Sequence, residues 1–379
     1  MTNSISRRTL IKTSVSIPLA YGIYGSNAFA ASEHDEKAIK LLAKTPSIDM
    51  HAHPGRPWQP QRREDFKGKP FKTWRERAME KRIEQMKEGG LTASVQGVIS
   101  DFRRVKRSDG KLRFSSLPRK GMEYVDECCY RYDFQFDNLE NILSSGKASQ
   151  IHSPDTLIKS HREEKPGFIL AVEGGDALRG NVDAVNEAYD KGVNILQLIH
   201  NKPNELGDTQ TNDTSPVHNG LSEFGMSVVK RMNELRMIID LAHATYKSTK
   251  AAVKITNKPI ILSHTHLGSN TPRAINKDHA KLISGTGGVI GIWQNVSCCR
   301  SINDYVGQIF KMVDVVGIDH VGIGTDLDGA KVPWDNYSPY SNFYKVPSRL
   351  LEKGMAADEV EKIIGGNFLR VWREIIRTS

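Results

Sequence analysis

The chain has 379 residues, of which 38% are hydrophobic and 26% charged, and no run beyond the N-terminus is long and apolar enough for a membrane span. This balance suits a soluble globular protein with a large core, in one large or two ordinary domains. The formal net charge is +9, and without the first thirty residues it is +6, from 50 bases and 44 acids. Short basic patches at residues 61–63 and 103–107 favour a solvated face over a nucleic-acid interface, so no nucleic-acid partner is expected.

The N-terminus has the pattern of an export signal. Residues 6–12 form a twin-arginine motif, residues 14–29 are weakly apolar, and residues 28–30 provide a small-X-small cleavage site. Proline and glycine interrupt the apolar stretch, which makes it a poor membrane anchor. We therefore expect residues 1–30 to be cleaved after export by the twin-arginine machinery, to the periplasm or the cell exterior. Residues 31–379 are expected to be the folded domain, with no stable membrane anchor.

A regular alternation of strand-like and helical segments follows the signal. A helix is expected over residues 33–43, and another over residues 221–235, where apolar residues recur with helical spacing. Eight short runs rich in β-branched residues are nearly continuous in apolar residues, as strands covered on both faces should be. These runs are residues 47–51, 94–100, 168–173, 193–200, 237–243, 259–264, 288–293 and 320–326.

The alternation predicts the fold class. Strands separated by helices indicate a parallel sheet, and eight such units predict a closed (β/α)8 TIM-type barrel. An open doubly wound sheet is the alternative, but no glycine-rich phosphate loop follows an early strand, because the glycines at residues 285–288 precede one. Residues 101–167 are interpreted as an insertion after strand two that covers the barrel mouth, with a helix over residues 122–144. The irregular residues 201–219 should also lie at the mouth, and residues 357–376 should form two helices broken at a glycine pair.

The four cysteines form two adjacent pairs, Cys128 with Cys129 and Cys298 with Cys299. Four cysteines allow three connectivities, and neither pair has zinc-knuckle spacing. Buried thiols and one long-range disulfide between the pairs both remain open, and no catalytic role is assigned to them.

Possible metal ligands lie where the strand-like runs end. Because side chains in a strand alternate faces, Asp49, His51 and His53 are expected to point to one side, where two imidazoles can grip a metal ion. In a (β/α)8 barrel the C-terminal strand ends form the active site, and imidazole with carboxylate suits zinc and similar divalent ions. The set is large enough for two metals with a bridging carboxylate. Its other members are Glu173, His200, His243, His264 and Asp326.

With these strand-end residues in place, the chain resembles the membrane (renal-type) dipeptidases, a binuclear zinc branch of the amidohydrolase superfamily. The matching segments occur in family order over nearly the whole mature chain. They are residues 48–53, 172–175, 197–201, 220–224, 239–243, 259–264, 322–329 and 365–371.

The resemblance implies a ligand set for two zinc ions. His51 matches the first histidine ligand of the first metal, and His53 stands where the family usually has aspartate, so it is expected to take over that ligand position. Glu173 matches the bridging glutamate, and His243 with His264 matches the ligands of the second metal. The exchange at His53 removes one negative charge, which leaves the metal preference and the substrate range open.

The resemblance also implies catalytic and substrate-binding roles. His200 matches the histidine that touches the substrate carbonyl, Arg273 the arginine for the substrate carboxylate, and Asp326 the aspartate that hydrogen-bonds the metal-bound water. His266 and Asp328 have no such role and are interpreted as structural. Family relatives are often dimers, so a homodimer is an expectation.

The leading hypothesis is an exported zinc dipeptidase that cleaves dipeptides with a free C-terminal carboxylate, by attack of a metal-bridging hydroxide. One alternative is another amidohydrolase reaction, on a lactam, a cyclic amide or an N-acyl amino acid. The other is a non-catalytic periplasmic binding protein that keeps only the barrel.

Overall fold

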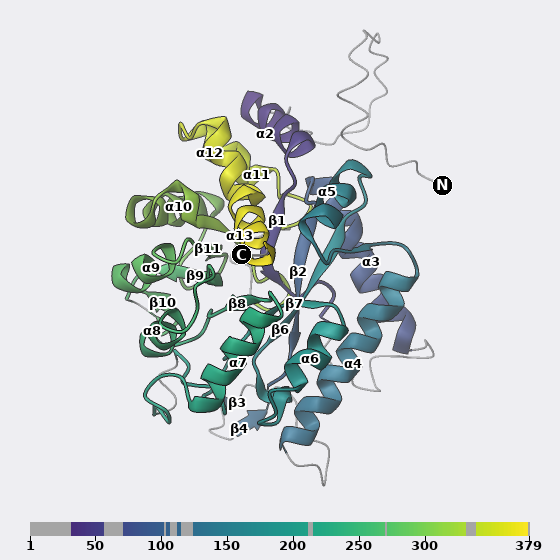
Figure 1. Cartoon of the computed structure of the whole chain (residues 1–379). Coiled ribbons are helices and arrows are strands. Elements are labelled where there is room, and N and C mark those ends of the chain that lie inside the picture. The colour runs from purple at the N-terminus through teal and green to yellow at the C-terminus, as the bar shows by residue number, and fades with distance from the viewer. Residues whose placement is uncertain are drawn as a thin grey trace, which may run out of the picture.

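A parallel β-barrel surrounded by helices forms the body of the protein, as seen in a computed structural model (Figure 1). The structure describes residues 32–56, 71–101, 104–106, 112–114, 124–210, 215–269, 271–330 and 339–377. The predicted export signal therefore lies outside the described residues. The barrel strands, in their order around the sheet, are β1 (Ile48–Ala52), β2 (Ala93–Ile99), β6 (Gly167–Glu173), β7 (Val193–Gln197), β8 (Ile238–Asp240), β9 (Ile261–Leu267), β11 (Val289–Trp293) and β12 (Val321–Gly324).

This eight-strand path confirms the predicted (β/α)8 TIM-type barrel. Every neighbouring pair along it is parallel. The first and last strands close the barrel just past the end of β12, where the N–H of Asp326 donates to the carbonyl of His51 and the N–H of His53 donates to that of Leu327, both at 2.8 Å. Three of these four residues, His51, His53 and Asp326, were predicted to form the site.

Helices pack around the strands and fill the connections between them (Figure 1). Several begin at a serine, threonine or asparagine whose side chain accepts a backbone N–H of the first turn, as at Ser222 and Ser301. Among the described residues, none of the helices is long and apolar enough to cross a membrane. They are α2 (Glu33–Lys44), α3 (Phe71–Gly89), α4 (Tyr124–Ser144), α5 (Pro154–Arg162), α6 (Ala184–Asp190), α7 (Glu223–Glu234), α8 (Tyr246–Val253), α9 (Lys277–Ser284), α10 (Ile302–Val316), α11 (Lys345–Glu352), α12 (Ala357–Glu361) and α13 (Asn367–Ile376).

Two apolar clusters hold these layers together. The larger lies between the strands and the outer helices, and the smaller combines one set of alternate strand residues, such as Val95 and Ile169, with side chains of α13. Trp372 and Phe368 of α13 are fully buried there, so this helix fills one end of the barrel. The predicted break before it is confirmed, because the segment Lys362–Gly366 has non-helical backbone at Gly365.

Two strands that carry histidines are irregular at the positions that matter for the site. The pairing of β1 with β2 shifts register between Asp49 and Ala52, and the pairing of β9 with β11 shifts between Leu262 and Thr265. Such irregularities re-aim side chains, and they are frequent next to active sites. His51 and His264 lie within these two intervals.

The shift in β1 makes one sequence expectation wrong, because Asp49 does not share a side with His51 and His53. Its carboxylate accepts the hydroxyl of Thr325 at 2.5 Å and that of Tyr340 at 3.2 Å. Tyr340 belongs to the outer apolar cluster, so Asp49 ties β1 to the end of β12 away from the histidines.

The segment after β2 is described in parts. It contains the hairpin of β3 (Arg104–Lys106) and β4 (Leu112–Phe114), and then α4, which contacts α3, β2 and the short helix Asp176–Leu178. The described part of α4 is thus an outer helix, and coverage of the mouth by residues 101–167 stays a prediction. None of the four cysteines forms a disulfide, so the two pairs are not linked to each other.

Candidate metal centre

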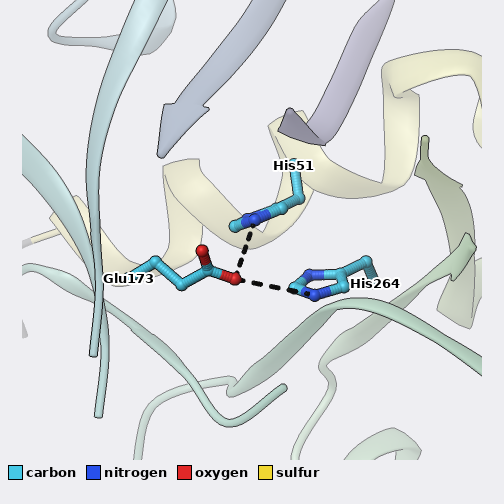
Figure 2. A group of neighbouring side chains, drawn as sticks. All are labelled: His51, Glu173 and His264. Atoms are coloured by element: carbon cyan, nitrogen blue, oxygen red, sulfur yellow. Dashed lines mark ion pairs between the residues drawn. The ribbon is translucent and has the colours of Figure 1, made fainter. Parts of the chain in front are cut away.

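Five imidazoles converge on the carboxylate of Glu173, the last residue of β6. The side chain is 2% exposed, and Figure 2 shows one of its oxygens facing both His51 and His264. The distances from an Nε2 atom to the nearer Glu173 oxygen are 3.2 Å for His51, 3.3 Å for His53, 3.4 Å for His200, 3.6 Å for His243 and 3.8 Å for His264. All the predicted metal ligands and His200 are therefore brought to one point.

Backbone conformation at the strand ends helps to aim these groups. His243 and Asp326 have φ values of 70° and 53°, in the left-handed region that non-glycine residues rarely adopt. Each follows the end of its strand, β8 or β12, by two or three residues. A strained backbone that is held by the surrounding structure is typical of functional sites.

The donor set fits divalent metal ions. Within the part of the chain that is described, three groups have ligand atoms within 4.8 Å of one another, namely His51 with Glu173 and His264, His51 with His53 and Asp326, and Glu173 with His200 and His243. Oε2 of Glu173 is buried and accepts no hydrogen bond. A bound cation would give this oxygen the partner that a buried polar atom needs. Glu173 and His51 each belong to two of these groups, so the donor atoms form one continuous cluster.

The pKa values of several groups in this cluster are shifted strongly from their ordinary values. Burial alone would raise the pKa of Glu173, but the neighbouring His200, His51 and His53 hold it well below its usual range. Burial, aided by Arg273, lowers the pKa of His243 well below its ordinary value, and burial together with His51 does the same for His264. Glu173 is thus ionised and His243 and His264 are neutral, as metal binding requires. His51 differs, because burial opposes its charged form but Glu173 and other nearby carboxylates together raise its pKa.

Asp326 lies at the edge of the cluster. Its Oδ1 is 3.5 Å from His53 Nε2, and its Oδ2 accepts the indole N–H of Trp293 at 3.0 Å. Burial, with the charge of Glu173, raises the pKa of Asp326. A carboxylate of raised pKa beside the candidate metal site is suited to accept and return a proton.

Asp101 was missed by the sequence analysis. It is 2% exposed, and its Oδ1 lies 2.5 Å from Nδ1 of His200 while its Oδ2 accepts the backbone N–H of Asn201 at 3.0 Å. Burial opposes a charged His200, but Asp101 and Glu173 raise the pKa of this imidazole to about 9. His200 is therefore a cation at neutral pH that directs Nε2 at the site. Its position two residues after β2 was the signal that could have revealed Asp101.

Trp293 was missed as well, although it is the last residue of β11 and so has the same strand-end signal. Besides its bond to Asp326, its ring lies 5.4 Å from the guanidinium carbon of Arg273 and 6.0 Å from the ring of His266. The indole therefore contacts both Asp326 and Arg273, the predicted substrate-binding arginine.

Arg273 lies beside the cluster, as the resemblance implied. Its guanidinium donates to the carbonyl of His264 at 3.1 Å and to the side chain of Gln210 at 3.3 Å, while its buried Nε atom has no partner. Gln210 belongs to the irregular segment predicted at the mouth. Burial lowers the pKa of Arg273 to about 10, so it remains charged at neutral pH.

The two side chains interpreted as structural lie to the side. Asp328 accepts two hydrogen bonds from Arg82, at 2.8 and 2.7 Å, and the N–H of Gly55 at 2.9 Å. His266 is buried against Trp293, and burial lowers its pKa to about 4. Neither residue belongs to the three groups of ligand atoms found within the described residues.

A buried cluster of imidazoles around one carboxylate, at the C-terminal rim of a (β/α)8 barrel, defines a metal-dependent barrel enzyme. Comparison with known proteins agrees with this class. Residues 35–379 match the sequence profile of the membrane dipeptidases, peptidase family M19. The dipeptidase verJ of Clonostachys rogersoniana is 26% identical over 355 residues, which cover 90% of this chain and 87% of that protein. The dipeptidase tcpJ of Claviceps purpurea is 29% identical over 252 residues, 64% of this chain but only 59% of that relative's length.

Solved structures share the fold. The probable dipeptidase PvdM of Pseudomonas aeruginosa superposes with a TM-score of 0.73 at 19% identity, over 90% of this chain and 98% of that one. A metallo peptidase of Rhodobacter sphaeroides, solved with a phosphinate mimic of the dipeptide L-Ala-D-Ala, gives 0.69 at 18% identity, over 87% and 99%. The chain therefore belongs to the membrane dipeptidase family, peptidase family M19, whose members are metallo-dipeptidases.

Proposed function

We propose that this protein is an exported, zinc-dependent dipeptidase that cleaves dipeptides with a free C-terminal carboxylate. The observation that carries the proposal is the convergence of five imidazoles on the buried Glu173, beside a half-buried arginine. Relatives named dipeptidases support the same reaction.

The cluster would hold two zinc ions, with Glu173 shared between them, His51 and His53 on one side and His243 and His264 on the other. When bound, these ions would lower the pKa of a water molecule toward about 7 and so supply the hydroxide that attacks the peptide carbonyl. Nitrogen and carboxylate donors in this number suit zinc better than calcium or magnesium, which prefer oxygen ligands.

The chain's own residues then account for proton movement and orientation. His200, held as a cation by Asp101, donates from Nε2 to the carbonyl oxygen of the substrate as negative charge develops there. Asp326 accepts a proton from the attacking water and returns it to the leaving amine. Trp293 fixes the orientation of Asp326 through its indole N–H.

Arg273 supplies the preference for a free carboxylate. Its guanidinium can form two parallel hydrogen bonds with a carboxylate, and it has a buried Nε atom without a partner. Because it lies against the backbone of the ligand His264, a carboxylate held there belongs to a short substrate.

The test compares two substrates and three proteins. A dipeptide and the same dipeptide with a C-terminal amide are offered to the wild type, Arg273→Lys and Arg273→Ala, all loaded with zinc. We expect Arg273→Ala to lose about 10- to 100-fold in kcat/KM on the free acid and little on the amide, with Arg273→Lys between them. Equal losses on both substrates would show that Arg273 does not recognise the carboxylate. In a separate assay of the wild type, hydrolysis of lactams or N-acyl amino acids in preference to dipeptides would favour another amidohydrolase reaction.

Export through the twin-arginine pathway forms the second part of the proposal, and its support is the motif at residues 6–12. That pathway moves folded proteins, so the metal ions could be loaded before export. Replacing both Arg7 and Arg8 with lysine should retain the protein inside the cell, as followed by fractionation. Unchanged export of the double variant would refute this part and leave the peptidase assignment intact.

A further inference from the structure

Two adjacent thiols lie near the candidate metal centre, in the connection from β11 to α10. The sulfur atoms of Cys298 and Cys299 are 3.1 Å apart. The loop that holds them is tight, because the backbone N–H groups of both residues donate to the carbonyl of Asn295, at 3.1 and 2.9 Å. This connection follows a strand end, so it lies at the same end of the barrel as the histidine cluster.

The other adjacent pair provides a contrast within the same chain. Cys128 and Cys129 are successive residues of helix α4, and successive side chains diverge by about 100° around a helix axis. They do not face one another, so a bond between them is excluded while the helix persists. In the loop pair, by contrast, the two sulfur atoms are in contact.

We propose that Cys298 and Cys299 form a reversible thiol–disulfide pair that adjusts the neighbouring metal centre to the redox state of the surroundings. The oxidant is a small disulfide such as glutathione disulfide. The thiolate of Cys298 attacks one of its sulfurs and releases one small thiol. The thiolate of Cys299 then attacks the mixed disulfide, so that the Cys298–Cys299 bond forms and a second small thiol leaves. Two protein thiols are oxidised, and one small disulfide is reduced to two thiols.

Exposure assigns the two roles. Cys298 is half-buried and follows a turn in which Val296 is 46% exposed, so a small disulfide can approach it. Cys299 is 1% exposed and is reached only from its neighbour, as a resolving thiol should be. The pKa values agree, because a hydrogen bond from Cys299 lowers the pKa of Cys298 and the same contact raises that of Cys299.

Geometry also makes the bond easy to reverse. The sulfur atoms must approach by about 1 Å to reach bonding distance. Neighbouring Cα atoms are about 3.8 Å apart, shorter than the roughly 4.4–6.8 Å of ordinary disulfides. A disulfide under such constraint is reduced more readily than a structural one, which suits a regulatory role rather than a stabilising one.

Trp293 connects this pair to the metal centre. Its carbonyl lies 3.4 Å from the sulfur of Cys298 and 3.8 Å from that of Cys299, within reach of a thiol proton, and its indole N–H donates to Asp326. Oxidation leaves no thiol proton that can be donated to that carbonyl. The indole, and with it the Asp326 carboxylate, then loses part of its support, so the oxidised protein should hydrolyse substrate more slowly; this consequence rests on the proposed function.

The experiment follows thiols and activity separately. Zinc-loaded full-length protein is equilibrated with glutathione at several ratios of disulfide to thiol, alkylated, digested and analysed by mass spectrometry. We expect the peptide with both cysteines to lose two hydrogens and to resist alkylation until a phosphine reductant is added. We also expect kcat/KM on a dipeptide to fall by about three- to tenfold and to recover on reduction.

Two variants serve as controls. Cys128→Ser with Cys129→Ser should keep both responses, whereas Cys298→Ser should keep the basal activity and lose both. Full alkylation of Cys298 and Cys299 at every ratio, or only mixed disulfides with glutathione, would overturn the proposal. A bond that forms without any change in hydrolysis would overturn its regulatory part, and absence of hydrolysis in the reduced wild type would count against the proposed function alone.

Discussion

Gly97 leaves the space that two imidazoles of the metal centre occupy. A Cβ atom at this position would lie 2.9 Å from Cε1 of His53 and 3.2 Å from Cε1 of His51, and the carbonyl of Gly97 lies 2.9 Å from Nδ1 of His53. The absence of a side chain on β2 therefore sets the orientation of both rings. Its neighbours in the sequence give no hint of this, because the rings come from another strand.

We predict that Gly97→Ala weakens zinc binding and lowers kcat/KM by about 10- to 100-fold, since displaced ligand rings no longer meet Glu173. Metal content by elemental analysis and dipeptide hydrolysis measure the two effects. Gly307→Ala is the matched control, because Gly307 lies within α10 and, apart from its own turn of the helix, no atom lies within 4 Å of the added Cβ. That control should keep full activity and gain up to about 1 kcal/mol of stability. Full zinc occupancy in Gly97→Ala would contradict the prediction.

Asp101 acts through His200, so its removal should affect catalysis more than folding. We predict that Asp101→Asn lowers kcat by about tenfold or more with a smaller change in KM, because His200 loses the charge that helps to raise its pKa to about 9. The pH profile of kcat should shift to lower pH on its basic side. An unchanged profile with reduced activity would mean that Asp101 has only a structural role.

At the scale of elements, the first helix is joined to a late one by a buried carboxylate. Asp35 of α2 accepts the hydroxyl of Ser348 at 2.7 Å and the ammonium of Lys345 at 2.6 Å, both from α11. Burial opposes the charged form, but these partners lower the pKa of Asp35 below its usual value. This contact fixes α2, and with it the entry into β1 and the first two histidines.

The lowered pKa of Asp35 makes the free energy of unfolding depend on pH in a definite direction. The contribution of Asp35 to folding is fully present above its unfolded pKa of about 4, and it is lost as the pH falls through the lower pKa of the folded state. We predict that Asp35→Asn lowers the free energy of unfolding by about 1–2 kcal/mol at pH 7, and that the gap to the wild type narrows below pH ~4. Urea unfolding of both proteins at pH 7, 5 and 3 measures this difference in the free energy of unfolding. A gap that is constant with pH would show that charge is not the cause.

At the scale of the whole molecule, the barrel concentrates the imidazoles and Glu173 at one rim, while α13 fills the barrel with apolar side chains. Without cations, holding these closely spaced ligand atoms together costs folding free energy. Bound metal ions should therefore stabilise the entire domain, because they bind the folded chain and not the unfolded one.

We predict that a chelator lowers the Tm of the zinc-loaded protein by about 5–10 °C, and that added zinc restores it. Differential scanning calorimetry provides the measurement. Glu173→Gln, which removes the shared carboxylate, should bind less zinc and respond little to the chelator. If chelation left the wild-type Tm unchanged while removing the zinc, the metal centre would be independent of the fold.

Local patterns in the sequence were sufficient for the elements and for most of the site. The eight strands, the helix α2 and the residues at strand ends follow from apolar runs, spacing and position, which are properties of neighbouring residues. The convergence of His51, Glu173 and His264 also follows, because the C-terminal ends of parallel strands in one barrel meet at one rim.

The tertiary structure alone decided how individual side chains point. The register shift in β1 turns Asp49 away from the histidines, and no alternation rule predicts a shift that depends on the facing strand. The pairing of Asp101 with His200, the space at Gly97 and the contact between Cys298 and Cys299 depend on how separate segments or a tight loop pack in space. Sequence spacing encodes the local backbone, whereas these contacts arise only when the barrel closes and brings distant residues within reach.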